Sequence, residues 1–198
     1  MRHITLITTG GTIEKTYDEM TGELTNRVSI VGRMLEHLRL EGTEVTIAEL
    51  MRKDSLHMTD EDRAAIVAAV RGTGILPVVP TGNRPDLKGQ PIQDTGGTPV
   101  PRTSGIVILH GTDTLTITGE QLLREIPDPV VPIVLTGAMR PFEMTRSDAL
   151  QNLTEAIFAA GMLSEMGKSG VYCAAHGRVL KFPGVRKDRE KGTFVAGP

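Results

Sequence analysis

Two short apolar runs, far apart in the sequence, each end in a turn built from glycine and threonine. Residues 4–7 lead into the sequence TTGGT at 8–12, and residues 105–109 lead into HGTDT at 110–114. Apolar runs of this length are typical of buried strands, and a strand that stops in such a turn presents hydroxyl groups at the carboxyl edge of its sheet. Ligands of open α/β sheets bind at that edge. The two turns therefore predict one site that is built from two strand ends.

The rest of the chain alternates short apolar runs with segments of helical period, which favours an α/β fold with a mostly parallel sheet and covering helices. Thr59 is expected to cap a helix whose first turn is acidic, and Ser147 and Asp148 offer the longest helix a similar start. The predicted strands cover residues 3–8, 44–49, 106–109, 132–135 and 170–175, and the predicted helices cover 31–40, 60–71, 118–125 and 148–166.

One stretch breaks this alternation. Residues 72–104 carry six prolines separated by glycines, and such a tract sustains neither a helix nor a central strand. We interpret it as an exposed insertion or loop, with a functional lid as the alternative. The chain as a whole, residues 1–198, is predicted to be a single domain.

Composition argues against several classes of partner. The net charge of the 198 residues is −2, and the chain holds four Phe, two Tyr and no Trp, so neither a nucleic-acid surface nor a base-stacking platform is expected. No apolar stretch approaches membrane-spanning length and no leader segment is recognisable, so we expect no membrane partner and a cytoplasmic location. Cys173 is expected to be a buried structural thiol. The histidines lack metal-ligand spacing, and no metal is expected.

The glycine turns admit three interpretations. The first is phosphate binding, which has little support because the Walker and dinucleotide patterns are both absent. A purely structural turn is the second, and the third makes Thr12 a nucleophile beside backbone amides that stabilise an oxyanion. Thr112 and Asp113 favour the third, because a lysine near them would complete a hydroxyl–lysine arrangement. Spacing alone leaves Lys168, Lys181 and Lys187 open as that lysine. His110 is expected to be structural, and the charge run at 186–191 is expected to be a solvated tail.

Five ordered segments resemble the bacterial-type L-asparaginase family. The sequences TGGTI at 9–13 and HGTDT at 110–114 look like the two motifs of that family, and DSLHMT at 54–59, LTGAMRP at 135–141 and RSD at 146–148 resemble further family segments in the same order. The resemblance implies a three-layer sandwich like the asparaginase N-terminal domain. Because the usual member continues into a second domain, we expect a short version that lacks it.

The resemblance also implies an activity. Thr12 would attack the side-chain amide of L-asparagine, and water would hydrolyse the threonyl acyl-enzyme to give L-aspartate and ammonia without a cofactor. Tyr17 would activate or orient Thr12, and Lys187 would join Thr112 and Asp113 in a second triad. The implied substrate-binding residues are Gly11, Ser55, Leu56, Gly111 and Ala138, with Asp113 on the substrate ammonium group.

Leu56 departs from the family, because many members carry a polar residue there.

A homo-oligomer, dimer or tetramer, is expected by analogy. The alternatives are a glutaminase or other small-amide hydrolase, and a non-catalytic amino-acid-binding subunit with the same fold.

Overall fold

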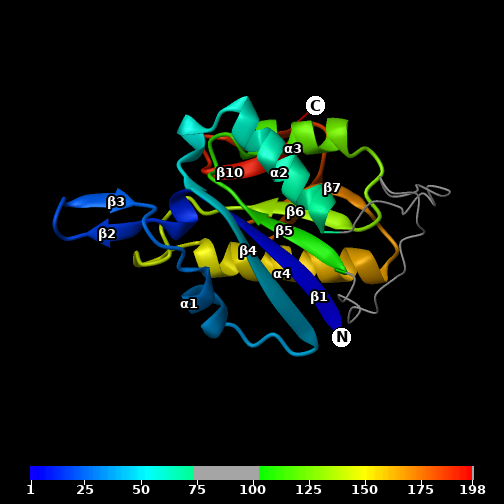
Figure 1. The fold of residues 1–198 in the computed structure, drawn as a ribbon, viewed down its shortest axis with the longest axis horizontal. Helices are drawn as coiled ribbons and strands as arrows, with labels where there is room; N and C mark the ends of the chain where they lie inside the picture. Colours follow the sequence, from blue (N-terminus) through cyan, green and yellow to red (C-terminus); the bar gives the residue numbers. More distant parts are fainter. Residues whose placement is uncertain (74–102, 198) are drawn as a thin grey trace, which may run out of the picture.

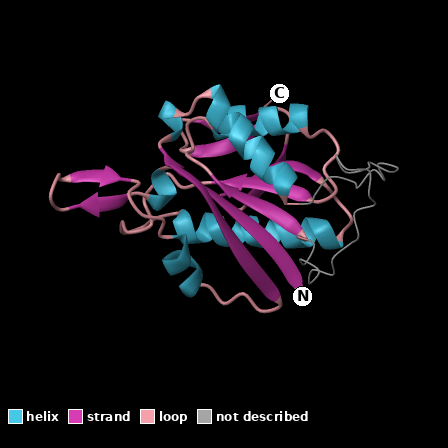
Figure 2. Cartoon of the chain, in the orientation of Figure 1, coloured by secondary structure: helices cyan, strands magenta, loops and turns pink. Residues whose placement is uncertain are grey.

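The computed structural model describes residues 1–73 and 103–197, which form a six-stranded sheet with helices on both faces (Figures 1 and 2). The strand order is β4-β1-β5-β6-β7-β8, and all neighbours are parallel except the antiparallel pair β7 and β8. The predicted α/β class with a mostly parallel sheet is confirmed. The elements are β1 Arg2–Gly10, η1 Thr12–Glu14, β2 Thr16–Asp18, β3 Glu23–Thr25, α1 Val31–Glu36, β4 Thr43–Lys53, η2 Ser55–His57, α2 Asp60–Gly72, β5 Gly105–Leu109, α3 Leu115–Glu125, β6 Pro132–Thr136, α4 Ala149–Glu165, β7 Gly170–Ala175, β8 Arg178–Lys181, β9 Val185–Asp188 and β10 Thr193–Ala196.

The sheet is the middle layer of three. Every residue of β5, β6 and β7 is buried, as expected for parallel strands covered on both faces. Helices α1 and α4 pack on one face, where Met34 and Ala156 belong to the same apolar cluster as Leu6. Helices α2 and α3 pack on the other, where Ile66 and Leu122 join a second cluster. Within the two described ranges, no helix has both the length and the apolar character needed to cross a membrane.

Several boundaries differ from the predicted ones. Helix α1 ends at Glu36 rather than at residue 40, and β4 continues beyond the predicted end to Lys53. The short strands β2, β3, β8, β9 and β10 were not predicted, because they are too short and too polar to show an apolar run. The predicted insertion at 72–104 falls largely at 74–102, outside the described residues.

The expected solvated tail at 186–191 is wrong. Residues 186–188 belong to β9, which pairs with β10 in antiparallel register and so forms a hairpin. Val185 and Phe194 are buried under this hairpin in the apolar cluster of the α2 and α3 face. Val185 of β9 and Phe194 of β10 thus anchor the hairpin, and the charged residues 186–188 belong to a paired strand.

Helix α2 begins as predicted at Thr59. The backbone N–H of Asp62 donates to the Thr59 hydroxyl (3.3 Å), and the N–H of Thr59 donates to the Asp62 carboxylate (2.8 Å), which together make a capping box. The start of α4 differs, because the Asp148 carboxylate makes no cap hydrogen bond to its own helix. Ser147 accepts from the Ala149 N–H instead (3.1 Å).

We predict that Thr59→Ala lowers the free energy of unfolding by about 1 kcal/mol, because it removes one side of the capping box. Thermal unfolding should show this as a decrease in Tm of about 2–4 °C for a chain of this size. Thr154→Ala is the matched control, since Thr154 is an exposed threonine inside α4 whose hydroxyl donates to Leu150 O. An equal loss in both variants would contradict the capping role.

Candidate active site

The first and second glycine turns touch through their backbones. Strands β1 and β5 are neighbours in the sheet, and their turns follow at the same carboxyl edge. Gly10 and Gly11 have φ angles of +88° and +81°, a region that side chains disfavour. A Cβ atom on Gly11 would lie 2.5 Å from the Cα of Gly111. Only glycine permits this approach, so the two threonine turns form one surface.

A third segment, which follows β4, closes against these turns. The side chain of Ser55 fills the space where a Cβ of Gly111 would stand, and the Ser55 carbonyl accepts from the hydroxyl of Thr114 (3.0 Å). Ser55 is therefore buried, with 1% of its surface exposed. Lys15 forms an ion pair with Asp54 (2.7 Å), and its hydrogen bond lowers the pKa of that carboxyl. Leu56, by contrast, is 65% exposed.

The fourth segment is the turn after β6. A Cβ on Gly137 would collide with the carbonyl oxygen of His110, so this turn also packs directly on the second motif. Ala138 is fully buried. The Asp148 carboxylate accepts from the backbone N–H groups of Met139 (2.9 Å) and Arg140 (3.0 Å), which fixes the turn from the start of α4.

A hydrogen-bond network continues from Asp148 to the hairpin of β9 and β10. The ring of His176 contacts Asp148 through Nε2 (2.9 Å) and the hydroxyl of Thr193 through Nδ1 (2.9 Å). Asn152 donates to Gly137 O (2.8 Å) and accepts from the N–H of His176 (3.0 Å). Burial pushes the pKa of Asp148 upward, but the donors around it outweigh burial and leave its pKa below the usual value. The network thus ties the turn after β6 to the hairpin that carries Lys187.

Lys187 reaches the second motif from β9. Its Nζ lies 2.8 Å from Thr112 Oγ1 and 3.1 Å from Asp113 Oδ1, and only 15% of its side chain is exposed. Arg189 also contacts Asp113 Oδ1, at 3.0 Å. Lys168 and Lys181, the two other lysines left open by spacing, are exposed, and Lys181 lies over the ring of Tyr172.

Both ring nitrogens of His110 form hydrogen bonds inside the protein. Its Nδ1 contacts Gly111 O (2.8 Å), which makes Nδ1 the protonated nitrogen, and its Nε2 therefore accepts from the Thr118 hydroxyl (2.8 Å). The ring is fully buried, and burial lowers the pKa of His110 to about 4. A neutral ring with both nitrogens engaged braces the second turn and has no free nitrogen for proton transfer.

Thr12 is half-buried at the start of η1, and the carboxyl group of Glu14 supports its turn from within. Glu14 accepts from Gly10 N–H (3.1 Å) and from the Ser29 hydroxyl (2.6 Å), and burial raises the pKa of Glu14. Tyr17 lies on the hairpin of β2 and β3, which projects from the body of the molecule (Figure 1). It is 60% exposed, and no hydrogen bond joins it to Thr12 among the described residues.

The structure thus brings together Thr12, Gly11, Gly111, Thr112, Asp113 and Lys187, with Ser55 and Ala138 buried behind them, while Tyr17 and Leu56 lie exposed. Sequence reasoning missed Arg189, Asp148, Asn152, His176, Glu14 and the ion pair of Lys15. Most of these are polar residues in loops or strand ends, and no spacing connected them. His176 alone among them had a local signal in the sequence, because a glycine follows it, and both residues have positive φ in the structure.

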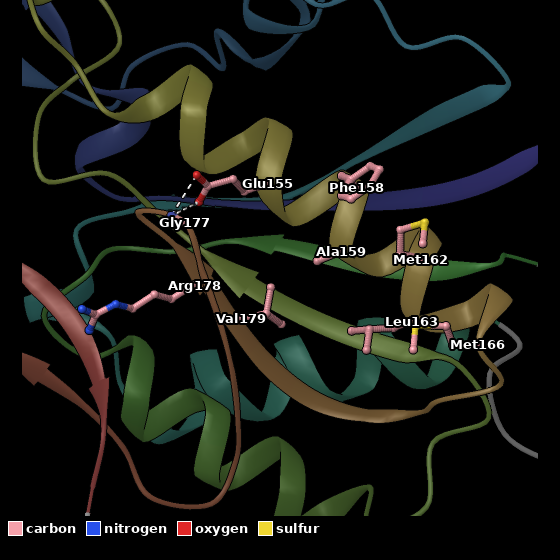
Figure 3. A pocket seen from close by; sticks show the side chains of 9 residues that line it. All are labelled: Glu155, Phe158, Ala159, Met162, Leu163, Met166, Gly177, Arg178 and Val179. Carbon is pink, nitrogen blue, oxygen red and sulfur yellow. Dashed lines mark hydrogen bonds between the residues drawn. The ribbon is translucent and has the colours of Figure 1, made fainter.

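A separate pocket lies between α4 and β8 (Figure 3). It has a volume of about 300 Å³ and is lined mainly by apolar side chains such as Phe158, Met162 and Val179. The Glu155 carboxylate in this pocket accepts hydrogen bonds from the backbone N–H of Gly177 (2.9 Å), which are drawn as dashed lines in Figure 3. The pocket has no hydroxyl nucleophile, and its one carboxylate is engaged by the backbone, so the sheet edge is the candidate active site. In the part of the chain that the structure describes, no group of three or more His, Cys, Asp or Glu side chains could hold a metal.

Threonine hydroxyls, a lysine and an aspartate thus lie together at the carboxyl edge of a parallel sheet, the edge at which open α/β sheets bind ligands. The profile of the family described as "Asparaginase, N-terminal" matches residues 3–74 and 97–193. The chain belongs to the asparaginase family.

The relatives are longer proteins. An L-asparaginase of Thermococcus kodakarensis is 42% identical over 76 residues, which are 38% of this chain and 22% of the relative. A component of the glutamyl-tRNA(Gln) amidotransferase of Methanobrevibacter smithii is 48% identical over 58 residues, 29% of this chain and 13% of the relative. The solved structure of the thermostable L-asparaginase from Thermococcus kodakarensis superposes with a TM-score of 0.73 and 26% identity, covering 98% of this chain. The chain spans about half (51%) of that solved chain.

We predict that Gly11→Ala destabilises the protein by more than about 2 kcal/mol, because the new Cβ combines left-handed strain with a clash against Gly111. Gly32→Ala is the control, since a Cβ there, within α1, would meet no atom within 4 Å and should stabilise by up to about 1 kcal/mol. Denaturant unfolding of both variants measures the difference. Similar stability of the two would show that the turns do not need this contact.

We also predict a pH dependence of stability from His110. Its pKa is about 4 when folded and near 6.5 when unfolded, so the unfolded chain binds the extra proton first as the pH falls. Above pH 6.5 this effect costs the protein no stability. As the pH falls from 6.5 to 4, the free energy of unfolding decreases by about 3 kcal/mol because of His110. Unfolding free energies measured from pH 7 to 4 should therefore fall less steeply in His110→Gln. A slope in His110→Gln equal to that of the parent would refute the assignment.

Proposed function

We propose that this chain hydrolyses the side-chain amide of L-asparagine to L-aspartate and ammonia, with Thr12 as the nucleophile. The observation that carries the proposal is the contact of Lys187 Nζ with both Thr112 and Asp113, on the turn whose Gly111 touches Gly11. A threonine hydroxyl is a poor nucleophile and needs a partner that accepts its proton. The contact between Gly11 and Gly111 places Thr112, with Lys187 bound to it, on the same surface as Thr12. These two residues are the proposed proton acceptor.

The proposed reaction has two halves. Thr12 Oγ1 forms a bond to the amide carbon and gives up its proton, while the C–N bond breaks and the nitrogen leaves as ammonia after gaining a proton. Water then attacks the threonyl ester, which releases L-aspartate and restores the hydroxyl. Thr112 and Lys187 exchange the protons in both halves, and Asp113 holds the lysine. The backbone N–H of Thr112 would stabilise the oxyanion of each tetrahedral intermediate, because the N–H groups of Gly10 and Gly11 already donate to Glu14 and to Lys53 O.

Tyr17 has a conditional role in this proposal. Family resemblance makes it the residue that orients Thr12, and it follows η1 closely in the chain. Because it lies exposed on the projecting hairpin, the role requires the hairpin of β2 and β3 to fold over the sheet edge when substrate binds. The expected homo-oligomer and cytoplasmic location remain predictions.

Glutamine is the second candidate substrate. A glutaminase-asparaginase of Pseudomonas aeruginosa is 41% identical over 76 residues, and a component of an amidotransferase is also among the relatives. The two amides differ by one methylene, which a fitted pocket discriminates by only about 1–3 kcal/mol. Some release of ammonia from glutamine is therefore consistent with the same site.

We predict that purified protein releases ammonia from L-asparagine, and that Thr12→Ala lowers kcat by about 10³-fold or more because it removes the nucleophile. Lys187→Met should lower kcat by about 10²-fold or more through the loss of proton exchange. A coupled ammonia assay with L-asparagine and with L-glutamine measures both variants.

The controls are Lys181→Met and Lys168→Met, which remove exposed lysines away from Thr112. They should keep the parent kcat. Turnover by Thr12→Ala close to that of the parent would refute the nucleophile assignment. Folded parent protein that releases ammonia from neither amide would refute the proposed function and favour the non-catalytic amino-acid-binding alternative.

A further inference from the structure

The side chain of His110 forms a hydrogen bond with the peptide group that joins the next two residues. Its Nδ1–H donates to the carbonyl oxygen of Gly111 at 2.8 Å. That carbonyl and the backbone N–H of Thr112 belong to one planar trans peptide unit, in which the C=O and the N–H point in opposite directions. A hydrogen bond that fixes the carbonyl of Gly111 therefore also fixes the direction of the Thr112 N–H. Within residues 1–73 and 103–197, this N–H donates to no protein oxygen.

The peptide between Gly111 and Thr112 needs such a restraint because its first residue is glycine. A Cβ atom on Gly111 would collide with the hydroxyl oxygen of Ser55, so the packing of the site excludes any larger residue there. Glycine is also the residue whose backbone rotations are least restricted. The steric requirement that brings the segments together thus removes the Cβ that elsewhere limits the direction of a peptide plane.

The ring of His110 is itself held from α3. Thr118, which is fully buried, donates its hydroxyl to Nε2 of the ring at 2.8 Å. Burial lowers the pKa of His110 to about 4, so at neutral pH the ring is uncharged and carries its one proton on Nδ1. The Thr118 hydroxyl, the Nδ1–H of the ring and the N–H of Thr112 form one series of donors. Hydrogen bonds in such a series polarise one another, which strengthens the last donor.

We propose that His110 is a positioning residue for amide hydrolysis, because it holds the peptide after Gly111 so that the N–H of Thr112 is directed at the oxyanion. The inference rests on the proposed function, in which that N–H stabilises the tetrahedral intermediates. The negative charge develops on the oxygen only as the transition state forms, and a donor that is already in place needs no reorientation at that moment. An N–H that turns away loses this stabilisation, while the contacts that bind the ground state of the substrate remain. The expected effect of losing His110 is therefore on kcat rather than on KM.

Two amide substitutions separate the hydrogen bond from the space that the ring fills. The side-chain nitrogen of Asn takes the position of Nδ1 of histidine, and that of Gln takes the position of Nε2. His110→Asn therefore keeps a donor for the carbonyl of Gly111, whereas His110→Gln keeps only the contact with Thr118. With L-asparagine, we expect His110→Gln to lower kcat by about 10²-fold, the scale of one lost oxyanion donor, with KM changed by less than about threefold. His110→Asn should keep a kcat at least about tenfold higher than that of His110→Gln, although it leaves more of the ring volume empty.

Val70→Ala is the control for a loss of stability. Val70 is buried in the apolar cluster of the α2 and α3 face and lies at the end of α2, so its truncation destabilises the protein without touching the turn after β5. It should keep the parent kcat. Equal values of kcat in His110→Asn and His110→Gln, a parent value in His110→Gln, or the same loss in Val70→Ala would overturn the inference.

The NMR signal of the Thr112 amide gives a readout that needs no turnover. Its ¹⁵N shift depends on the hydrogen bond that the preceding carbonyl accepts, so it should move in His110→Gln and stay near the parent position in His110→Asn. L-Aspartate, the product, presents a carboxylate oxygen in place of the amide oxygen. Its addition should shift the Thr112 amide signal in the parent and in His110→Asn, but not in His110→Gln.

These spectra separate the inference from the proposed function. A parent protein that releases no ammonia refutes the proposed function, but the expected pattern of Thr112 shifts would still support the positioning of this donor by His110. Equal shifts in the two variants would overturn the inference. A parent spectrum in which L-aspartate leaves the Thr112 amide unchanged would also overturn it, and this measurement needs no variant to fold.

Discussion

Strands β1 and β5 run side by side, and the turns that follow them meet backbone to backbone at Gly11 and Gly111. The other parts of the site are stacked on this contact. Ser55 fills the space beside Gly111, and Gly137 packs against the carbonyl of His110. A side chain at any of these glycines would separate the segments, and the hydroxyls of Thr12 and Thr112 would no longer share a surface. The chemistry that we propose therefore depends on a steric constraint of the backbone.

The hairpin of β9 and β10 supplies the cationic side chains of the site. The hairpin of β9 and β10 is anchored by two buried apolar side chains and by the contact of His176 with Thr193. Through Asp148, the same network holds the turn after β6. Lys187 is consequently presented to Thr112 by a short strand that would have little stability alone. Lys187 and Arg189 both reach Asp113 from this one hairpin, the lysine from a mostly buried position and the arginine from an exposed one.

The elements that sequence patterns predicted well are the long and strongly patterned ones. Strands β5 and β6 each contain an uninterrupted apolar run, and the acidic residues that follow Thr59 at the start of α2 indicate a helix cap. The short polar strands gave no such signal, since their stability comes from pairing and from a few buried anchors. For that reason the charge run at 186–191 indicates a solvated tail, whereas residues 186–188 lie in the paired strand β9. In the same way, Asp148 looked like a helix cap, but its carboxylate is occupied by N–H groups that follow β6.

The sequence by itself determined the α/β class and family resemblance, and it placed glycine and threonine turns at strand ends, because strand periodicity and the φ freedom of glycine are local properties of the chain. Spacing left three lysines open, and only resemblance favoured Lys187. The tertiary structure decided which lysine meets Thr112, which side chains lie buried behind the turns, and that Arg189 shares an oxygen of Asp113 with Lys187. These are contacts between residues distant in sequence, and they exist only once packing and strand pairing have fixed the geometry.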